Sequence, residues 1–179
     1  MIDNGGPTLH ILFVCTGNIC RSPTAERLVS AYAGESQLRG LSASSAGTRA
    51  VVGHAIHPEA ASALRDLGGD DARFSARQFT PKIASTADLI LTMTNAHRDS
   101  VLELAPSKLN QTFTLMEASR LVSAHRAQTV TDLVKFRPFL QPSDRGDITD
   151  PIGQGADVFR AVAAQIANLL PPIVDLSAR

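Results

Sequence analysis

Apolar positions along the chain fall into short runs that alternate with amphipathic stretches, which predicts strands and helices in turn. From Leu9 to Val14 the residues after His10 are apolar on both faces, as is typical of a parallel strand covered by helices on both sides. Further strands are predicted at 42–46, 89–91 and 112–115. This alternation implies a parallel sheet with right-handed crossovers and a ligand at the carboxyl ends of its strands.

Apolar residues at helical spacing predict four helices, at 23–33, 57–67, 95–104 and 156–170. The first has Tyr32 in the core and ends at Gly34, and the last ends at Pro171 and Pro172. In the segment 117–149 charged and apolar residues are mixed, so one or two short helices followed by an irregular loop are expected.

The residues between the first strand and the first helix, Cys15 to Ser22, contain the most distinctive chemistry. A strand enters this loop and a helix opened by Pro23 leaves it, so backbone N–H groups and a helix N-terminus point at one spot. That spot favours negative charge. Arg21 adds a planar fork that can hold two oxygens of one phosphate. Charge and shape therefore both indicate a phosphoryl group.

Cys15 stands at the mouth of this loop, where the same field favours the thiolate, the nucleophilic form of cysteine. A cysteine and an arginine at this spacing also occur by chance, and a lone cysteine is commonly a small buried apolar residue. The context favours a catalytic site. The loop follows a strand, Gly17 and Asn18 can adopt left-handed backbone angles, and Pro23 suits a first helical position.

Composition limits the classes of function. The chain has 179 residues, 44% of them hydrophobic, which fits one domain. Lys plus Arg and Asp plus Glu number 17 each, so no broad field attracts nucleic acid or an acidic membrane. No apolar run approaches the roughly 20 residues of a membrane helix, and residues 1–7 are interpreted as a loose tail without signal-peptide features.

The cysteines and histidines indicate neither a disulfide framework nor a metal site. Cys15 and Cys20, the two cysteines of the chain, suit reactive thiols in a reducing compartment, so a cytoplasmic protein is expected. The five histidines show no zinc-ligand spacing and are expected to lie at the surface or to be satisfied in the interior. Gly17 belongs to no nucleotide-binding pattern. We therefore expect neither a metal nor a cofactor.

Several motifs together point to one family. The segment Val14–Pro23, followed by Ala25 and Glu26, resembles the signature of the bacterial low-molecular-weight protein tyrosine phosphatases. The likeness continues at 45–48, 77–80, 88–91 and 150–151. We predict a single domain over 1–179, an α/β three-layer sandwich. Its four-stranded parallel sheet has the order 2-1-3-4, with helices on both faces and the phosphate-binding loop after the first strand.

Hydrolysis of a phosphate monoester needs a second residue that protonates the leaving oxygen. Asp150 is the leading candidate, because Pro151 disfavours helix at this position and leaves the carboxylate on a loop. The spacing alone equally allows Asp150 to cap the last helix, and Asp147 is the weaker alternative acid. The family resemblance implies that Asp150 is the general acid, that Cys15 forms a phosphocysteine, and that no metal is needed.

The resemblance also implies roles for the other loop residues. The substrate is expected to be bound by backbone N–H groups of the loop, together with Arg21; the loop residues concerned are Thr16, Gly17, Asn18, Ile19, Cys20 and Ser22. Ser22 is expected to cap the helix and, by resemblance, to donate to the thiolate. By the same resemblance Asn18 is tied to Ser45. Cys20 is interpreted either as a redox partner of Cys15 or as a buried residue that only fills space in the interior.

Two departures from the family pattern affect substrate choice. Many members have an aromatic residue after the Asp-Pro pair, whereas Ile152 and Gly153 follow here, and the chain has one Tyr and no Trp. Preference for aryl substrates is therefore left open. The segment 117–149 is longer than usual and is a candidate lid or docking surface.

The sequence suggests four candidate functions. A phosphotyrosine phosphatase is favoured, and an arginine phosphatase of the same fold is the main alternative, although that branch carries Thr where Ile19 stands. Arsenate reductases relay through cysteines beyond the loop, which this chain lacks. A binding module without turnover would lack Cys15 or Asp150. By resemblance, a tyrosine kinase of polysaccharide export or a host phosphoprotein is a candidate substrate, and a monomer or weak dimer is expected.

Overall fold

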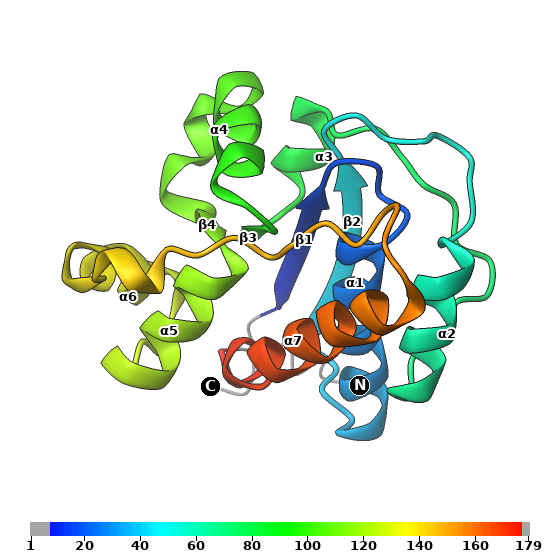
Figure 1. The fold of residues 1–179 in the computed structure, drawn as a ribbon. Helices are drawn as coiled ribbons and strands as arrows, with labels where there is room; N and C mark the ends of the chain where they lie inside the picture. The colour runs from blue at the N-terminus through cyan, green and yellow to red at the C-terminus, as the bar shows by residue number, and fades with distance from the viewer. Residues whose placement is uncertain (1–7, 177–179) are drawn as a thin grey trace, which may run out of the picture.

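The strand β1 (Leu9–Cys15) lies at the centre of the sheet and pairs on both sides. The computed structural model describes residues 8–176, and the predicted tail at 1–7 lies outside the described residues. β1 pairs in parallel with β2 (Leu41–Gly47) and β3 (Leu89–Thr92), and β3 pairs in parallel with β4 (Thr112–Thr114). The order β2-β1-β3-β4 confirms the predicted parallel sheet (Figure 1).

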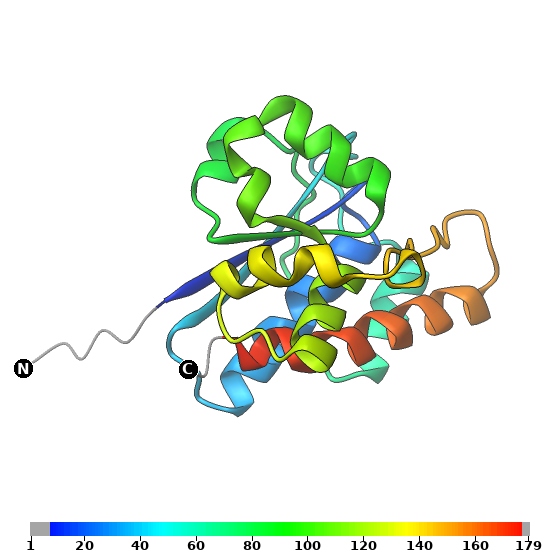
Figure 2. The same ribbon diagram turned by 90° about the vertical axis from the view of Figure 1, so that its left-hand side faces the viewer.

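Helices cover both faces of this sheet. Residues 8–176 form the α-helices α1 (Arg21–Glu35), α2 (Pro58–Asp66), α3 (Pro81–Ser85), α4 (Asn95–Leu104), α5 (Leu115–His125), α6 (Val130–Phe136) and α7 (Ala156–Asp175). The 3₁₀ helices are η1 (Pro106–Gln111), η2 (Arg137–Phe139) and η3 (Pro142–Asp144). The helices α1, α2, α5 and α7 pack on one face, and α3 and α4 pack on the other (Figure 2). This arrangement confirms the three-layer sandwich.

The apolar run of β1 supplies both halves of the core. Successive strand residues point to opposite faces. Ile11 and Phe13 therefore join the core under α1 and α7, and Leu12 and Val14 join the core under α3 and α4. All four side chains are fully buried, which explains the absence of polar alternation in this strand.

The helix α1 begins earlier than predicted. Its first residue is Arg21 rather than Pro23. The Thr24 N–H donates to the Cys20 carbonyl at 3.1 Å, so the chain passes from the loop into the helix without a separate turn. The last loop residues thus already have helical geometry.

The prediction that Gly34 ends α1 is also wrong, because the helix continues to Glu35, two residues beyond the predicted range 23–33. A glycine ends a helix when it adopts the left-handed conformation. Here Gln37 has the positive φ, 53°, and Gly34 does not. Tyr32 is only partly buried and packs at the margin of the core, not within it.

The helix α7 continues through two prolines that were predicted to end it. Pro171 and Pro172 lie inside the helix, which runs to Asp175. Each proline removes a backbone donor and disfavours the preceding helical turn. Burial of apolar side chains beyond them opposes this cost, since Ile173 is fully buried and Leu176 is 8% exposed. Tertiary packing therefore overrides the local signal.

Two short helices, α5 and α6, occupy much of the segment 117–149, as predicted, and η2 and η3 precede the irregular loop. The helix α3 was not predicted, although Thr80 at its N-cap accepts a hydrogen bond from the Ile83 N–H and Pro81 begins it. None of the helices between residues 8 and 176 is both long and apolar enough to cross a membrane.

Arg137 attaches the segment 117–149 to the outer edge of the sheet. Its guanidinium lies 3.8 Å from the centroid of the Phe113 ring in β4. It also donates to the backbone carbonyls of Thr112 and Leu109. A cation over an aromatic face and two carbonyl acceptors together fix this side chain. The edge strand β4 is thereby covered.

Replacement of Ile173 by Ala is expected to lower the free energy of unfolding by about 2–5 kcal/mol, because it leaves a cavity beneath the end of α7. The control is Asn168→Ala on the exposed side of the same helix, with an expected change below about 0.5 kcal/mol. Urea unfolding measures both. A cost at Ile173 as small as that at Asn168 would mean that α7 is not packed beyond its prolines.

Candidate active site

The phosphate loop, residues 15–22, joins the carboxyl end of β1 to α1, and its backbone is held from one side. Three N–H groups of the segment 48–51 donate to the carbonyls of the first three loop residues at 2.9–3.0 Å. Within residues 8–176 the N–H groups of 16–20 have no protein acceptor. With the carbonyls engaged elsewhere, these amides form a concave set of donors suited to an anion.

Gly47, the last residue of β2, permits the close approach of this segment to the loop. A Cβ atom at Gly47 would lie 2.4 Å from the Thr16 carbonyl oxygen, closer than a real side chain can come. The Gly47 backbone is itself held, because its N–H donates to the Arg77 carbonyl at 2.9 Å. Only a residue without a side chain fits here.

Asn18 shapes the loop from within. It is fully buried and has a left-handed backbone, with φ of 55°, whereas Gly17 does not have the positive φ that the sequence suggested. Its Nδ2 donates to the Ser22 and Ser45 hydroxyls at 2.9 and 2.8 Å. Its Oδ1 accepts from the Arg77 N–H at 2.9 Å. The side chain thus offsets the backbone strain with three hydrogen bonds.

Ser45 connects this network to the partly buried carboxylate of Glu26. Its hydroxyl donates to the Glu26 carboxylate, while its backbone carbonyl accepts from the Arg77 Nε at 2.8 Å. Burial raises the pKa of Glu26, and the hydrogen bond from Ser45 acts in the opposite direction. A continuous set of polar contacts therefore supports the loop from behind.

Ser22 lies next to the cysteine sulfur. The distance from Ser22 Oγ to Cys15 Sγ is 3.0 Å. Because Ser22 Oγ already accepts a hydrogen bond from the Asn18 amide, its own proton is free to point at the sulfur. The prediction that Ser22 caps α1 is wrong, since Cys20 occupies the N-cap position. The hydroxyl is thus available to the sulfur.

Arg21 links the loop to the Asp-Pro segment. Only 4% of its side chain is exposed, and its Nη1 donates to the Ile148 carbonyl at 3.0 Å. Its Nη2 pairs with Asp150 Oδ2 at 2.9 Å, while the Asp150 side chain is 48% exposed. The alternative that Asp150 caps the last helix is wrong, because Gly155 is the N-cap of α7. Asp150 therefore lies beside the loop, paired with Arg21.

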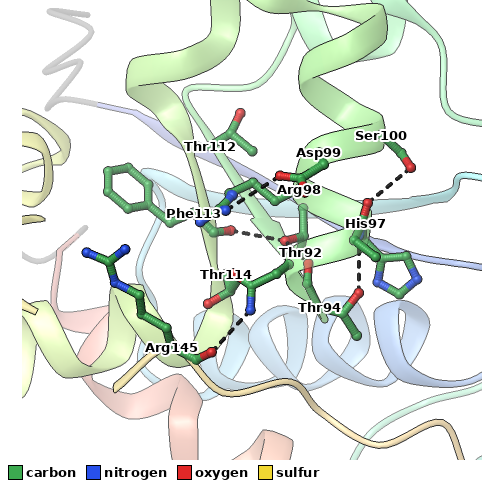
Figure 3. Close-up of polar contacts among 12 residues, drawn as sticks. Thr92, Thr94, His97, Arg98, Asp99, Ser100, Thr112, Phe113, Thr114 and Arg145 are labelled. Atoms are coloured by element: carbon green, nitrogen blue, oxygen red, sulfur yellow. Dashed lines mark hydrogen bonds and ion pairs between the residues drawn. The ribbon is translucent and has the colours of Figure 1, made fainter. Parts of the chain in front are cut away.

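The chain that leads to Asp150 is attached to the start of α4. Asn95 donates to Asp147 Oδ1 through its N–H at 2.8 Å and through Nδ2 at 2.9 Å. The Arg145 carbonyl accepts a hydrogen bond from the same Nδ2 at 3.1 Å, and Figure 3 draws this bond as a dashed line. Asp147 thus anchors this segment to α4, whereas Asp150 pairs with Arg21.

A cavity of about 220 Å³ brings most of the predicted residues together. Its lining consists of Cys15, Thr16, Gly17, Ile19, Cys20, Arg21, Arg49, Val51, Asp150 and Ile152. The side chains of Asn18, Ser22 and Ser45 lie behind the loop instead of lining the cavity. No group of His, Cys, Asp and Glu side chains able to hold a metal ion occurs among residues 8–176.

His97, in the first turn of α4, contacts the phosphate loop. Its Nε2 lies 2.8 Å from the Thr16 hydroxyl, and its N–H donates to Thr94 at the N-cap (Figure 3). The side chain is 7% exposed. Burial, with a smaller contribution from Arg21, lowers the pKa of His97 to about 4. The imidazole is therefore neutral near pH 7.

Sequence reasoning missed both Asn95 and His97. It treated His97 as a surface or satisfied histidine, because a histidine without ligand spacing carries no signal of its own. A clue exists in the topology, since both residues follow β3, which neighbours β1, at the carboxyl edge of the sheet. The first turn of α4 thus contacts the phosphate loop and the Asp-Pro segment at once.

Cys20 is buried beside the site. Burial raises the pKa of the Cys20 thiol to about 12, and the neighbouring Cys15 adds to the effect. Both cysteines are free thiols in the structure. Cys20 is therefore protonated at neutral pH.

The family model for low molecular weight phosphotyrosine protein phosphatases matches residues 10–127, from β1 through α5. The chain belongs to this family. It is accordingly a phosphatase, a metal-independent hydrolase of phosphoric monoesters.

Relatives of this phosphatase carry names of two kinds. A protein-arginine-phosphatase of Geobacillus stearothermophilus is 32% identical over 93% of this chain and 94% of its own. A probable low molecular weight protein-tyrosine-phosphatase, EpsP of Ralstonia nicotianae, is 36% identical over 76% of this chain and 89% of its own. The solved low molecular weight protein tyrosine phosphatase from T. tengcongensis has a TM-score of 0.75 at 28% identity, covering 94% of this chain and 99% of its own.

Replacing His97 by Gln is expected to reduce the pH dependence of stability between about pH 6.5 and about pH 4. Because the folded-state pKa is lowered, the unfolded chain takes up this proton first, so the wild type loses stability as the pH falls through that range. The Gln variant lacks that loss. Urea unfolding at several pH values measures the difference, with exposed His54→Gln as the control. Identical slopes in wild type and His97→Gln would contradict the assignment.

Proposed function

We propose that this phosphatase hydrolyses phosphotyrosine in proteins through a phosphocysteine intermediate, with Cys15 as the nucleophile and Asp150 as general acid and base. The supporting observation is the single cavity that Cys15, Arg21 and Asp150 line together with the loop amides. A sulfur, a set of anion donors and a carboxylate around one small space suit an in-line displacement at phosphorus.

In the first step the Cys15 thiolate attacks phosphorus while the bond from phosphorus to the tyrosine oxygen breaks. Asp150, in its acid form, gives its proton to that oxygen. In the second step the Asp150 carboxylate removes a proton from water, whose oxygen attacks phosphorus and releases phosphate and the thiolate. Arg21 and the loop amides hold the three equatorial oxygens, where charge spreads in both transition states.

Ser22 supports both steps. Its hydroxyl lies 3.0 Å from the sulfur and carries a proton that no other acceptor requires. A hydrogen bond to the sulfur favours its charged form, which is the attacking group in the first step and the leaving group in the second. Asn18 and Ser45 act by holding this arrangement.

The walls of the cavity support an aromatic substrate without aromatic stacking. Ile19, Val51 and Ile152 contribute aliphatic side chains to the lining. Val51 and Ile152 are 38% and 44% exposed, so they form an open apolar rim. Such a rim suits the flat faces of a phenyl ring, which gain from burial against aliphatic groups.

Hydrolysis of phosphoarginine is the second candidate. It is favoured by the relative from Geobacillus stearothermophilus, which bears the name of an arginine phosphatase and aligns over almost its full length. Against it stands Ile19, at the position where the arginine phosphatases resembled by this chain carry Thr. The N–H groups of a phosphoarginine guanidine would be buried against an apolar side chain there, which costs free energy unless they find acceptors.

We propose a phosphotyrosine protein as the substrate and the cytoplasm as the compartment. A phosphotyrosine protein, such as a tyrosine kinase of polysaccharide export, fits the proposed reaction. A cytoplasmic location fits two free cysteines, one of which must stay reduced to act. A monomer or weak dimer would leave the cavity open to such a partner.

Cys20 is proposed to protect Cys15 from irreversible oxidation. Peroxide converts the Cys15 thiolate to a sulfenic acid, and the Cys20 sulfur then displaces its oxygen as water to form a disulfide. Both cysteines line the same cavity, and the Cys15 charge that helps to raise the pKa of Cys20 is absent once Cys15 is a sulfenic acid.

Asp150→Ala is expected to slow turnover by about 10²–10⁴-fold, because the leaving oxygen then departs without a proton. The loss should be larger for phenyl phosphate than for p-nitrophenyl phosphate, whose leaving group is stable as an anion. Steady-state rates on both substrates measure this. Asp147→Ala is the control, since loss of an anchor should slow both substrates equally. Near wild-type rates for Asp150→Ala on both substrates would contradict the assignment.

The choice between the two candidates is tested by kcat/KM on matched phosphotyrosine and phosphoarginine peptides. The wild type is expected to prefer phosphotyrosine, and Ile19→Thr is expected to shift the ratio about tenfold towards phosphoarginine, because the hydroxyl can accept a guanidine N–H. Val51→Thr, on another wall of the cavity, is the control. A wild type that prefers phosphoarginine would favour the second candidate.

A further inference from the structure

A second, larger hollow adjoins the catalytic cavity. It measures about 450 Å³, and its lining consists of Thr16, Thr48, Arg49, Ala96, His97, Ser100, Glu103 and Leu104. Thr16 and Arg49 also line the catalytic cavity, so the two spaces meet at these residues. We refer to this second space as the Arg49 groove. A polypeptide whose phosphorylated side chain enters the catalytic cavity has this groove as a direct continuation.

Two rigid elements form the sides of the groove. One side is the segment after β2, where the Arg49 N–H donates to the Thr16 carbonyl at 3.0 Å. The other side is one face of α4, which presents residues 96, 100 and 103 at helical spacing. Figure 3 shows His97 and Ser100 on the same side of α4, with Arg98 on the side towards Phe113. The groove is therefore held by the same contacts as the active site.

The groove carries two opposite charges in a defined order. Arg49 lies where the groove meets the catalytic cavity, and Glu103 lines the groove alone. Both are exposed, and neither side chain forms a hydrogen bond or an ion pair within residues 8–176. His97, which lines the same groove, is neutral near pH 7 because its pKa is about 4. A chain that leaves the catalytic cavity therefore meets a free cation first and a free anion second.

We propose that the Arg49 groove binds the substrate polypeptide beside its phosphorylated residue, and that it selects an acidic side chain next to that residue followed by a basic one. This proposal rests on the proposed function, since the groove is useful only to a phosphatase of polypeptides. The acidic side chain pairs with Arg49 and the basic one with Glu103. Small aryl phosphates do not reach the groove.

The proposal is tested with phosphotyrosine peptides in which one position at a time carries Asp, Ala or Lys. The position adjacent to the phosphorylated residue and the next position outward are varied separately, in one set before that residue and in a second set after it. The readout is the ratio of kcat/KM between the Asp and Ala peptides within one enzyme variant, so that any change in the chemical step cancels. The wild type should prefer Asp about three- to tenfold in one of the two sets, and the preference should shrink as salt is added.

Two variants assign the preference to the groove. Arg49→Gln should bring the ratio between Asp and Ala peptides close to one. Glu103→Lys should reverse the preference at the more distant position, from Lys to Asp. The control is Glu35→Lys, which makes the same change in net charge at an exposed site at the end of α1. It should keep the wild-type ratios, which excludes a general effect of charge.

The possible results distinguish a failure of this proposal from a failure of the proposed function. If the ratios are the same in the wild type, Arg49→Gln and Glu103→Lys, the groove does not select substrates and the proposal fails. The same holds if the wild type hydrolyses p-nitrophenyl phosphate but none of the phosphotyrosine peptides or their phosphoarginine counterparts. If p-nitrophenyl phosphate itself is not hydrolysed, the proposed function fails instead.

Discussion

The hydrogen bonds of one buried side chain, Asn18, hold the phosphate loop in its working shape. A left-handed residue that is not glycine costs free energy, and here three hydrogen bonds offset that cost. Through Ser22 the same amide sets the direction of the proton that faces the nucleophile. Through Ser45 it connects the loop to β2. The loop amides point inward because this network and the segment 48–51 occupy the groups on the outside.

Much of the fold follows from local pattern. The run from Ile11 to Val14 is apolar throughout because helices cover both faces of β1, and this one feature already implies a parallel sheet. The phosphate loop can also be recognised from the sequence, because the few residues of an anion site between a strand and a helix are consecutive. Asp150 cannot be assigned from local sequence pattern alone. Its position 135 residues after Cys15 is not a local property, and only the resemblance to the family's Asp-Pro pair distinguished it from a helix cap.

Contacts between distant segments explain what the sequence did not reveal. Pro171 and Pro172 carry a strong stop signal, yet packing of Ile173 against the core overrides it. The first turn of α4 holds Thr16 through His97 and the Asp-Pro segment through Asn95, and neither contact leaves a trace in spacing or composition. The family model matches residues 10–127, so α6 and the segment that leads to Asp150 lie outside that match.

The ion pair between Arg21 and Asp150 places a carboxylate beside the guanidinium that an incoming phosphate also needs. The Arg21 Nε–H has no partner within residues 8–176 and stays open to the phosphate, but one N–H of Nη2 points at Asp150, whose other carboxylate oxygen accepts from the Ile152 N–H at 3.2 Å. A phosphoryl oxygen that takes this Nη2–H displaces Asp150, which in the proposed mechanism is the group that acts next on the leaving oxygen. After turnover the carboxylate returns to Arg21 and competes with inorganic phosphate for it. The resting enzyme thus contains an internal competitor for its own product, which favours release over retention.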